Sequence, residues 1–244
     1  EPLHLPLDRP RPGSMSYHGG RQGIRFDPEL VRRLEAFCSG RRVTTFITLY
    51  SAFTALMAHL TGQEDVVVGV PMAGQAASGR FGLVGHAVNF LPFRTRVDLH
   101  RSFQDLLLDT REYVLDVNDH QRYTYAALLR QLRVRRAADQ VPLVSVMFNV
   151  DQGMESFDFD GVEARYRTSP RRFVKHDLFV NVVMEEEAPI LEVDHSSDVL
   201  DEETVRRWVD LYFRLLESVV ADPTQSSAAH FEALAGGEVA VASR

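Results

Sequence analysis

The sequence has little of several features that mark whole classes of protein. Cys38 is its single cysteine, which excludes an internal disulfide and a cysteine-rich metal site. No apolar run approaches the ~18–20 residues that a membrane span needs, and no signal peptide opens the chain. The net charge of −7 disfavours nucleic acid as a partner, because contact with phosphates needs a basic face. We therefore expect a cytoplasmic protein that binds neither nucleic acid nor a membrane.

The 244 residues, 45% of them apolar, are enough to bury a substantial core. Residues 1–23 contain four prolines and show no helical period, so we expect an extended leader or inter-lobe segment there. Residues 24–223 consist of apolar periodic segments separated by turns, and we interpret them as the folded unit. Residues 224–244 are rich in serine, alanine and glycine with weak periodicity, which predicts a linker or a disordered tail.

Helices are predicted where apolar residues recur every three or four positions. Asp27 followed by Pro28 is typical of a helix start. The clearest helix runs from Thr44 or Thr45 to Gly62, with a broad apolar stripe and a glycine suited to a left-handed end. Three more helices are expected over residues 102–117, 125–132 and 201–219.

Strands are predicted where β-branched and apolar residues run together. Residues 66–70 form a β-branched run that Pro71 ends, and residues 72–86 after it are a glycine-rich loop. Further strands are expected over residues 88–93, 144–150, 157–166, 178–184 and 190–193. This order of elements predicts an α/β fold of layered α+β type, in which helices pack on a mixed central sheet.

The motifs of self-sufficient enzymes are absent from the sequence. It has no phosphate-binding Gly-Lys-Ser/Thr loop and no Gly-x-Ser-x-Gly nucleophile turn. The nine histidines are scattered singly, without the spacing that places two metal ligands on one helical face. The paired carboxylates of residues 185–187 and 201–203 fall on an expected turn and an expected helix start. We therefore assign neither a catalytic residue nor a metal ligand.

Six segments of the sequence nevertheless resemble, in the same order, motifs of nonribosomal peptide synthetase condensation domains. They are residues 3–12 (LHLPLDRPRP), 61–74 (TGQEDVVVGVPMAG), 83–94 (LVGHAVNFLPFR), 120–125 (HQRYTY), 136–143 (RAADQVPL) and 199–208 (VLDEETVRRW). Residues 83–94 are similar to the family motif Ile/Val-Gly-x-Phe-Val-Asn-Thr, and residues 120–125 to His-Gln-Asp-Tyr-Pro-Phe. One such motif is weak evidence, but six in the family's order are strong evidence, and the resemblance runs over nearly all of residues 1–225.

The resemblance implies a fold, a reaction and a set of partners. Condensation domains have two lobes of the chloramphenicol acetyltransferase type, and carrier proteins deliver substrates on phosphopantetheine arms to a tunnel between the lobes, where an amide forms. The family's His-His-x-x-x-Asp-Gly motif belongs to the first lobe, and this sequence has no adjacent histidine pair. The chain thus resembles the C-terminal lobe and is expected to be inactive alone. Its implied partners are the missing N-terminal lobe, peptidyl or acyl carrier proteins and neighbouring synthetase domains. The resemblance implies no directly bound cofactor, because the phosphopantetheine arms of the carrier proteins serve as substrates.

Five residues are candidates for substrate binding by this resemblance: Asn89, Pro71, Gly74, Gly85 and Ser145. Asn89 matches the family asparagine near the tunnel, where it would bind substrate or order water, or else it satisfies backbone groups at a strand end. Pro71 and Gly74 would shape the tunnel wall where the backbone approaches the pantetheine arm, or they serve turn chemistry. Gly85 belongs to the glycine-rich loop, which brings backbone close to another group. Ser145 would line the channel or simply lie in the sheet.

The motifs also depart from the family pattern. Ala87, preceded by His86, stands where the family has phenylalanine, and Phe90 stands where it has threonine. Arg122 and Thr124 replace the aspartate and proline of the second motif. These changes indicate either a subtype with an unusual acceptor or a lobe that no longer supports turnover.

Two functions stay open at this point. The first is half of an amide-forming condensation domain, which predicts an exposed, apolar, concave face without its partner. The second is a catalytically silent module that docks a carrier protein or a neighbouring domain, which predicts a closed, polar surface. A free-standing acyltransferase is a weaker third, because it needs a histidine positioned by this chain alone.

Overall fold

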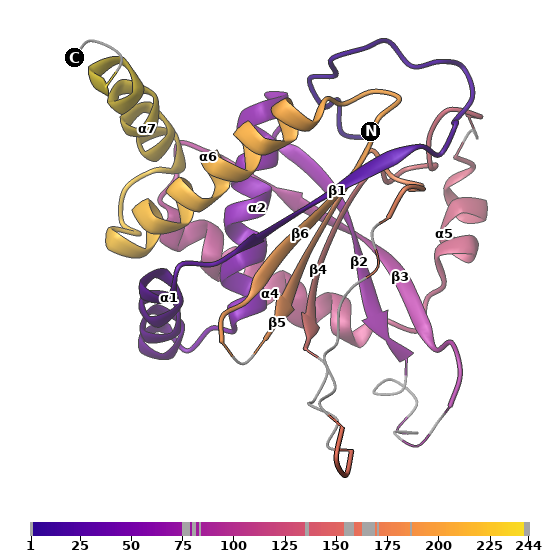
Figure 1. Cartoon of the computed structure of the whole chain (residues 1–244), viewed down its shortest axis with the longest axis horizontal. Helices are drawn as coiled ribbons and strands as arrows, with labels where there is room; N and C mark the ends of the chain where they lie inside the picture. Colours follow the sequence, from indigo (N-terminus) through magenta and orange to yellow (C-terminus); the bar gives the residue numbers. More distant parts are fainter. Residues whose placement is uncertain are drawn as a thin grey trace.

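The computed structural model describes residues 2–74, 79, 82, 84–134, 137–153, 159–162, 169, 171–185 and 187–241. In chain order the elements are β1 (Gly19–Arg25), α1 (Pro28–Arg41), α2 (Thr45–Thr61), β2 (Asp65–Ala73), β3 (Val88–Arg96), α4 (Phe103–Asp119), α5 (Tyr125–Leu132), β4 (Val146–Gln152), β5 (Leu178–Met184), β6 (Ile190–Ser196), α6 (Glu202–Ala221) and α7 (Ser227–Val241). The strands form one six-stranded sheet on which helices pack (Figure 1). The predicted α/β fold with a mixed central sheet is confirmed.

The sheet has the strand order β1-β6-β5-β4-β2-β3 and combines both pairing directions. The β2–β4 and β4–β5 pairs are parallel, whereas β1–β6, β5–β6 and β2–β3 are antiparallel. β4 and β5 pair along the whole of β4, but β2 meets β4 at a single register position, Gly69 opposite Met147. The β2–β3 pair is therefore joined to the rest of the sheet by a short seam.

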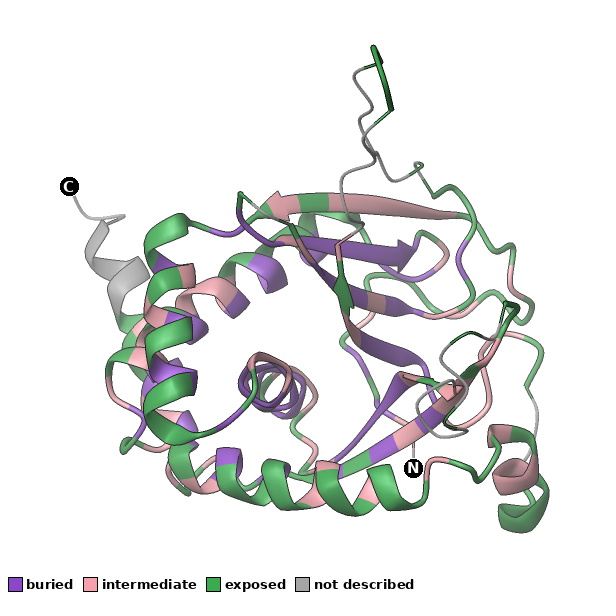
Figure 2. Ribbon diagram, turned by 90° about the horizontal axis from the view of Figure 1, so that it is seen from below, coloured by how far each residue is buried: buried purple, intermediate pink, exposed green. Residues whose placement is uncertain are grey.

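The central helix of the core is α2. Thr44 caps its start by accepting a hydrogen bond from the backbone N–H of Ile47, and Gly62 ends it in a left-handed conformation, as the sequence predicted. The helix is apolar around most of its circumference, which is typical of a helix enclosed by other elements. Its enclosure is visible in Figure 2, where the helix seen end-on is coloured almost entirely as buried.

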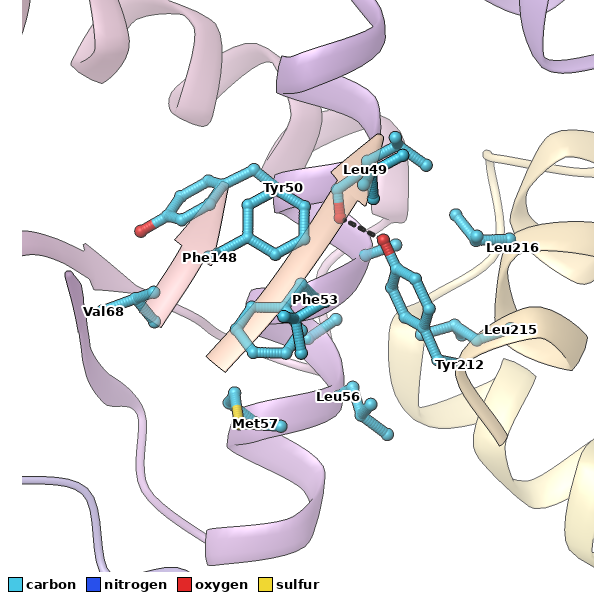
Figure 3. Close-up of a cluster of buried hydrophobic side chains, with 14 of the residues drawn as sticks. Leu49, Tyr50, Phe53, Leu56, Met57, Val68, Phe148, Tyr212, Leu215 and Leu216 are labelled. Carbon is cyan, nitrogen blue, oxygen red and sulfur yellow. Dashed lines mark hydrogen bonds between the residues drawn. The ribbon is translucent and has the colours of Figure 1, made fainter. Parts of the chain in front are cut away.

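Aromatic rings join α2 to the sheet and to α6 (Figure 3). Phe53 of α2 stacks on Phe148 of β4 with ring centroids 5.0 Å apart, and Tyr50 meets the same ring edge-on at 5.7 Å. On the other side, the hydroxyl of Tyr212 in α6 donates a hydrogen bond to the carbonyl oxygen of Leu49 at 2.9 Å. A small apolar cavity of about 20 Å³ lies between α2, α6 and the sheet. At this place the described core leaves little empty space.

The two faces of the sheet are covered unequally. The long helices gather on one face, and α5 lies apart from them beside β3 (Figures 1 and 2). Along β2, the side chains of Val66, Val68 and Val70 enter the main core, whereas Val67 points to the opposite side. That side carries a smaller apolar cluster, made of Val67, Val144, Met147, Phe90, Tyr125, Leu143 and Phe179. We call the side of the sheet with this smaller cluster the second face.

β2 is longer than the sequence predicted, because Pro71 does not end it. The strand continues to Ala73, with Pro71 opposite Phe90 of β3. In the described part of the chain β2 pairs with β4 at Gly69 alone, so the following residues have a strand on one side and tolerate a residue without an N–H. The predicted strand end was wrong for that reason.

The N-terminal segment packs on the fold. Leu3 and Leu5 are buried in the main core, and β1 begins at Gly19 and pairs with β6. These leucines follow a period of two, the period of an extended segment, which the intervening prolines obscure in the sequence. Glycine is needed at position 19, because a Cβ there would lie 2.5 Å from the carbonyl oxygen of His195. The predicted boundary at residue 23 therefore falls inside β1, and the division into domains stays a prediction.

The C-terminal segment also differs from the expectation. α7 occupies Ser227–Val241, where the sequence predicts a linker or a disordered tail. Alanine favours helix, but its small side chain gives little hydrophobic period, so the helix has a weak signature in the sequence. Phe231 is buried on this helix, and His59 of α2 stacks on its ring with centroids 3.9 Å apart. The tail is therefore docked against the core at least to Phe231.

The remaining predicted elements have different outcomes. The predicted helix at Tyr125–Leu132 and the predicted strand at Leu178–Met184 are confirmed to the residue. The strand expected over residues 157–166 lies mostly outside the described residues, within which Phe159 and Val162 form one antiparallel bridge. Among the described helices none is by itself both long and apolar enough to cross a membrane, and α1 with α2 meets that requirement only as a pair bent by 106°.

Candidate functional site

A surface hollow lies where β2 ends, β3 begins and the turn between α4 and α5 passes by. It offers about 370 Å³, within the range of roughly 300–1,000 Å³ that is typical of small-molecule sites. Its lining residues are Gly74, His86, Ala87, Val88, Asn89, Gln121, Arg122 and Thr124. The structure thus brings two of the five predicted substrate-binding residues, Asn89 and Gly74, to one place.

The amide of Asn89 is engaged by backbone groups. Its nitrogen donates to the carbonyl oxygens of Gln121 at 2.7 Å and Tyr123 at 3.1 Å, and its oxygen accepts from the N–H of Phe90 at 3.0 Å. These bonds fasten the turn between α4 and α5 to the start of β3. The interpretation of Asn89 as a strand-end residue that satisfies backbone groups fits this geometry, and its contact with substrate stays a prediction.

Gly74 is needed for a close approach of two backbone segments. Its N–H donates to the carbonyl oxygen of Ala87 at 2.6 Å, and a Cβ on Gly74 would overlap that same oxygen. The close approach that the sequence predicted for this glycine is therefore real, but the approaching group is Ala87 of the same chain. A pantetheine arm at this position stays a prediction.

Pro71 and Gly85 flank the hollow in sequence without lining it. Pro71 lies on β2 three residues before Gly74, and Gly85 directly precedes His86. Gly85 has a φ of +148°, which side-chain-bearing residues rarely adopt, and no described atom lies within 4 Å of the place where its Cβ would be. Gly85 therefore serves the turn that leads into β3.

Ser145 lies at the start of β4 and away from the hollow, so the structure does not bring it together with the other four candidates. It is buried, and its carbonyl oxygen accepts hydrogen bonds from the N–H groups of Asp177 at 2.9 Å and Leu178 at 3.3 Å. Its hydroxyl has no hydrogen-bond partner among the described residues. The backbone of Ser145 has a place in the sheet, while a role in a channel stays a prediction.

The second face is apolar near β2 and β3. The ring of Phe90 covers Gly69, where a Cβ would overlap it, and Tyr125 packs edge-on against Phe90 at 4.6 Å. Burial raises the pKa of Tyr125 to about 12, and its hydroxyl donates to the carbonyl oxygen of Pro142. Burial also lowers the pKa of His176 to about 4, so this ring, 6.1 Å from Phe90, is neutral at neutral pH. The surface around Phe90 and Tyr125 is therefore apolar, whereas further along the same two strands Arg94 forms an ion pair with Asp65 at 2.8 Å.

The second face is polar across β5, β6 and β1. Asn149 donates through its amide to Asn181 at 3.1 Å, and the next residue in this row is the buried carboxylate of Glu192. Arg21 of β1 forms ion pairs with Glu192 at 3.1 Å and with Asp194 at 2.5 Å. The described second face is therefore divided, and it is neither the continuous apolar surface nor the closed polar surface that the two hypotheses predict.

The described histidines stand on different elements. His86 is exposed at the hollow, His176 is half-buried on the second face, and His195 is buried on β6. Burial lowers the pKa of His195 as it does that of His176. Among the residues that the structure describes, no three His, Cys, Asp or Glu side chains gather as a metal site.

Comparison with known proteins identifies the family. The sequence matches the condensation domain family over residues 1–231, and the chain therefore belongs to that family. A linear gramicidin synthase of Brevibacillus parabrevis is 33% identical over 235 residues, which are 92% of this chain and 4% of that protein. Surfactin synthase subunit 1 of Bacillus subtilis (strain 168) is 31% identical over 222 residues, or 91% of this chain and 6% of that protein.

Solved structures share the fold at low sequence identity. The condensation domain of the monacolin K polyketide synthase aligns with a TM-score of 0.79 at 22% identity, covering 92% of this chain and 52% of that one. The X-domain from teicoplanin biosynthesis aligns with a TM-score of 0.79 at 19% identity, covering 93% and 53%. The chain thus spans about half the length of these solved relatives and a few per cent of the synthases.

Sequence reasoning did not nominate four polar residues that line the hollow: His86, Gln121, Arg122 and Thr124. All four had a signal in the sequence, because they lie at or next to positions where the two motifs depart from the family pattern. Asn89 and Gln121, which are 32 residues apart in the sequence, join the two motifs by a hydrogen bond. Several of the departures therefore lie around the hollow, whereas Phe90 lies in the smaller apolar cluster of the second face.

Proposed function

We propose that the chain is the C-terminal lobe of a nonribosomal peptide synthetase condensation domain and forms one wall of its substrate tunnel. The main support is that it aligns with about half of a solved condensation domain over nearly its whole length. The sequence also lacks the adjacent histidine pair of the family's first lobe. The proposal makes the isolated chain inactive in amide formation.

The proposed reaction joins a donor acyl thioester to an acceptor amine. The amine nitrogen attacks the thioester carbonyl, a C–N bond forms, the C–S bond breaks, and the nitrogen's proton leaves with the released thiol. In this proposal the missing N-terminal lobe supplies the base, and this chain holds the reactants. Correct placement of two reactants can lower a barrier by up to ~7–11 kcal/mol, so a lobe without a base still contributes to the rate.

The proposed substrates and partners follow from the family. Peptidyl or acyl carrier proteins would present phosphopantetheine-tethered substrates, and neighbouring synthetase domains would adjoin the chain. The apolar part of the second face around Phe90, Tyr125 and Met147 suits the carbon chain of a substrate. We place the chain in the cytoplasm, and the unpaired thiol of Cys38 is compatible with that reducing compartment.

A chimera tests this proposal. The matching 235-residue segment of the linear gramicidin synthase is replaced by this chain, and amide formation from two carrier-bound substrates is measured by mass spectrometry. We expect product from the chimera and none from the isolated chain. Product from the isolated chain would contradict the half-domain proposal, and a folded but inactive chimera would contradict the condensation function.

The alternative is a docking module of the same fold without catalysis. The X-domain from teicoplanin biosynthesis, which aligns with a TM-score of 0.79 over 93% of this chain, has been solved in complex with OxyB. A protein of this fold can therefore bind another protein. Calorimetry of the isolated chain with carrier proteins separates the two functions: binding by the chain together with an inactive chimera favours docking.

A further inference from the structure

Two neighbouring strands carry an asparagine at the same register on the second face. Asn149 of β4 and Asn181 of β5 are paired positions, and each interrupts an otherwise apolar run, VMFNV in β4 and LFVNV in β5. The residues that precede them, Phe148 and Val180, belong to the main core, so both asparagine side chains lie on the opposite side of the sheet. A polar side chain in an apolar strand is costly unless its groups form hydrogen bonds.

The pair keeps hydrogen-bonding groups that no described residue uses. The amide nitrogen of Asn149 donates to the amide oxygen of Asn181 at 3.1 Å, and neither side chain forms another hydrogen bond within the described part of the chain. The oxygen of Asn149 therefore remains an acceptor, and the nitrogen of Asn181 remains a donor. Exchanging the roles of the two amides would leave the same combination. Both residues are half-buried, so a ligand can reach these groups from the second face.

One acceptor beside one donor is complementary to a secondary amide. The N–H of such an amide can donate to the oxygen of Asn149, while its carbonyl oxygen accepts from the nitrogen of Asn181. An ester or a carboxylate has no hydrogen for the first of these bonds. Asp151 lies two residues further along β4 on the same side and is exposed, so its charge opposes an anionic ligand. The pair therefore favours a neutral amide.

Apolar side chains flank the asparagine pair along both strands. Met147 and Phe179 precede the pair by two residues on the second face, and Val183 follows Asn181 by two residues. Two residues of a strand span about 7 Å. An extended chain laid along β4 and β5 would therefore place carbon atoms on these side chains when its amide meets the pair.

The side of β4 that faces β2 is open beside Asn149. In the described residues β2 and β4 pair at Gly69 and Met147 alone, although β2 continues to Ala73 and β4 to Gln152. Past Met147 no described strand borders β4 on that side. A chain can therefore approach Asn149 without displacing a described strand.

We infer that Asn149 and Asn181 form a binding site for a secondary amide within an extended, apolar chain. The inference rests on the proposed function only for the source of the ligand, because a phosphopantetheine arm and a peptidyl chain both contain secondary amides. It goes beyond that function in the group that is recognised and in the two residues that recognise it.

Titration of the full 244-residue chain with N-acetyl-leucine methylamide, followed by NMR of side-chain and backbone amides, tests the inference. We expect saturable shifts of the side-chain amides of Asn149 and Asn181. The analogue methylated at both amide nitrogens cannot donate a hydrogen bond and should bind about tenfold more weakly. Pantetheine is titrated in parallel, and its affinity relative to the leucine probe shows whether an arm or a peptidyl chain is the better ligand.

Matched variants assign the binding to the pair. Asn149→Leu keeps the size of the side chain, and should weaken binding of the leucine probe about tenfold and remove its preference over the methylated analogue. Asn118→Leu makes the same change at an exposed position of α4, and should leave affinity and preference within about twofold. A retained backbone spectrum shows that each variant is folded, and the comparison of the two probes on the unaltered chain needs no variant.

Three results would overturn the inference. They are absence of saturable shifts at the two asparagines, equal affinity for the methylated analogue, and equal effects of the Asn149 and Asn118 variants. None of these measurements depends on amide formation. A failed titration therefore leaves the chimera experiment unaffected, and an inactive chimera leaves the affinity of the pair unaffected.

Discussion

The two faces of the sheet carry different kinds of side chain. The helix-covered face buries Tyr50, Phe53 and Phe148 almost completely, and its order depends on apolar packing. The second face carries an amide pair, the ion pairs of Arg21 and a smaller apolar cluster. Apolar packing is non-directional and stabilises the fold, whereas the placed polar groups of the second face specify what can bind. We therefore expect substitutions on the two faces to differ in how much they change the free energy of unfolding and in the type of interaction that they remove.

The largest expected effect is the loss of a ring on the helix-covered face. Phe148→Ala removes a fully buried ring that contacts three aromatic residues of α2, and should lower the free energy of unfolding by ~3–5 kcal/mol. Phe179→Ala removes the same ring from the second face of the adjacent strand, where it is only partly buried, and should cost about half as much. Urea unfolding followed by the fluorescence of Trp208 measures both.

Equal losses for the two phenylalanines would remove the contrast between the faces. They would mean that the second face packs as tightly in solution as the helix-covered one. A loss of ~5 kcal/mol approaches the total stability of a typical domain, so the Phe148 variant is best compared with the unaltered chain at low temperature and low urea.

The next effect concerns charge on the second face. Arg21→Met leaves the buried carboxylates of Glu192 and Asp194 without this guanidinium, and should cost ~3 kcal/mol. The control is Arg32→Met, which breaks an exposed ion pair with Glu29 and should leave the free energy of unfolding almost unchanged. Similar costs in urea unfolding for both variants would show that the Arg21 cluster is as well solvated as a surface pair.

Acid should act on the second face through His176. Burial lowers the pKa of His176 to about 4, whereas the pKa of this ring in the unfolded chain is about 6.5. Between these two pH values the unfolded state is protonated at His176 and the folded state is not, so acid favours unfolding. The stability linked to this ring is complete above pH 6.5 and is lost as the pH falls toward 4. Between pH 7.5 and 5 the unaltered chain should lose about 2 kcal/mol more than His176→Phe.

The measurement is urea unfolding at the two pH values for both chains. Other histidines whose pKa is lowered by burial, His59, His195 and His230, are present in both chains and cancel in the comparison. Replacement of the exposed His100 by glutamine is the control and should keep the slope of the unaltered chain. Identical slopes with and without His176 would place this ring in contact with solvent.

The helix-covered face could be predicted from sequence because its signals are local. Three local features specify α2 without reference to any other segment: the N-cap Thr44, the C-terminal Gly62 and the apolar stripe between them. Pro71 and the alanine-rich Ser227–Val241 misled the prediction, since a one-sided strand tolerates proline and alanine gives little period.

The hollow could not be assembled from sequence, because its rims are distant in the chain. Asn89 and Gly74 were nominated through motifs, but their partners, Gln121 and Ala87, come from long-range pairing. Arg122 carried a signal as a departure from a motif, yet nothing local indicates that it faces the same hollow as His86. Motif resemblance thus found part of the site, and the fold supplied the rest.

The smallest expected effect tests whether the rim of the hollow is as rigid as its hydrogen bonds suggest. Gly74→Ala places a Cβ against the carbonyl oxygen of Ala87, so the two backbones must separate, at a cost of ~1–3 kcal/mol. Gly40→Ala adds the same methyl group inside α1 with no atom within 4 Å, and should stabilise the chain by ~0.5–1 kcal/mol, since alanine favours helix. Opposite signs in urea unfolding would confirm a tightly closed rim. A neutral Gly74→Ala would show that the end of β2 yields freely and that the hollow has no fixed shape.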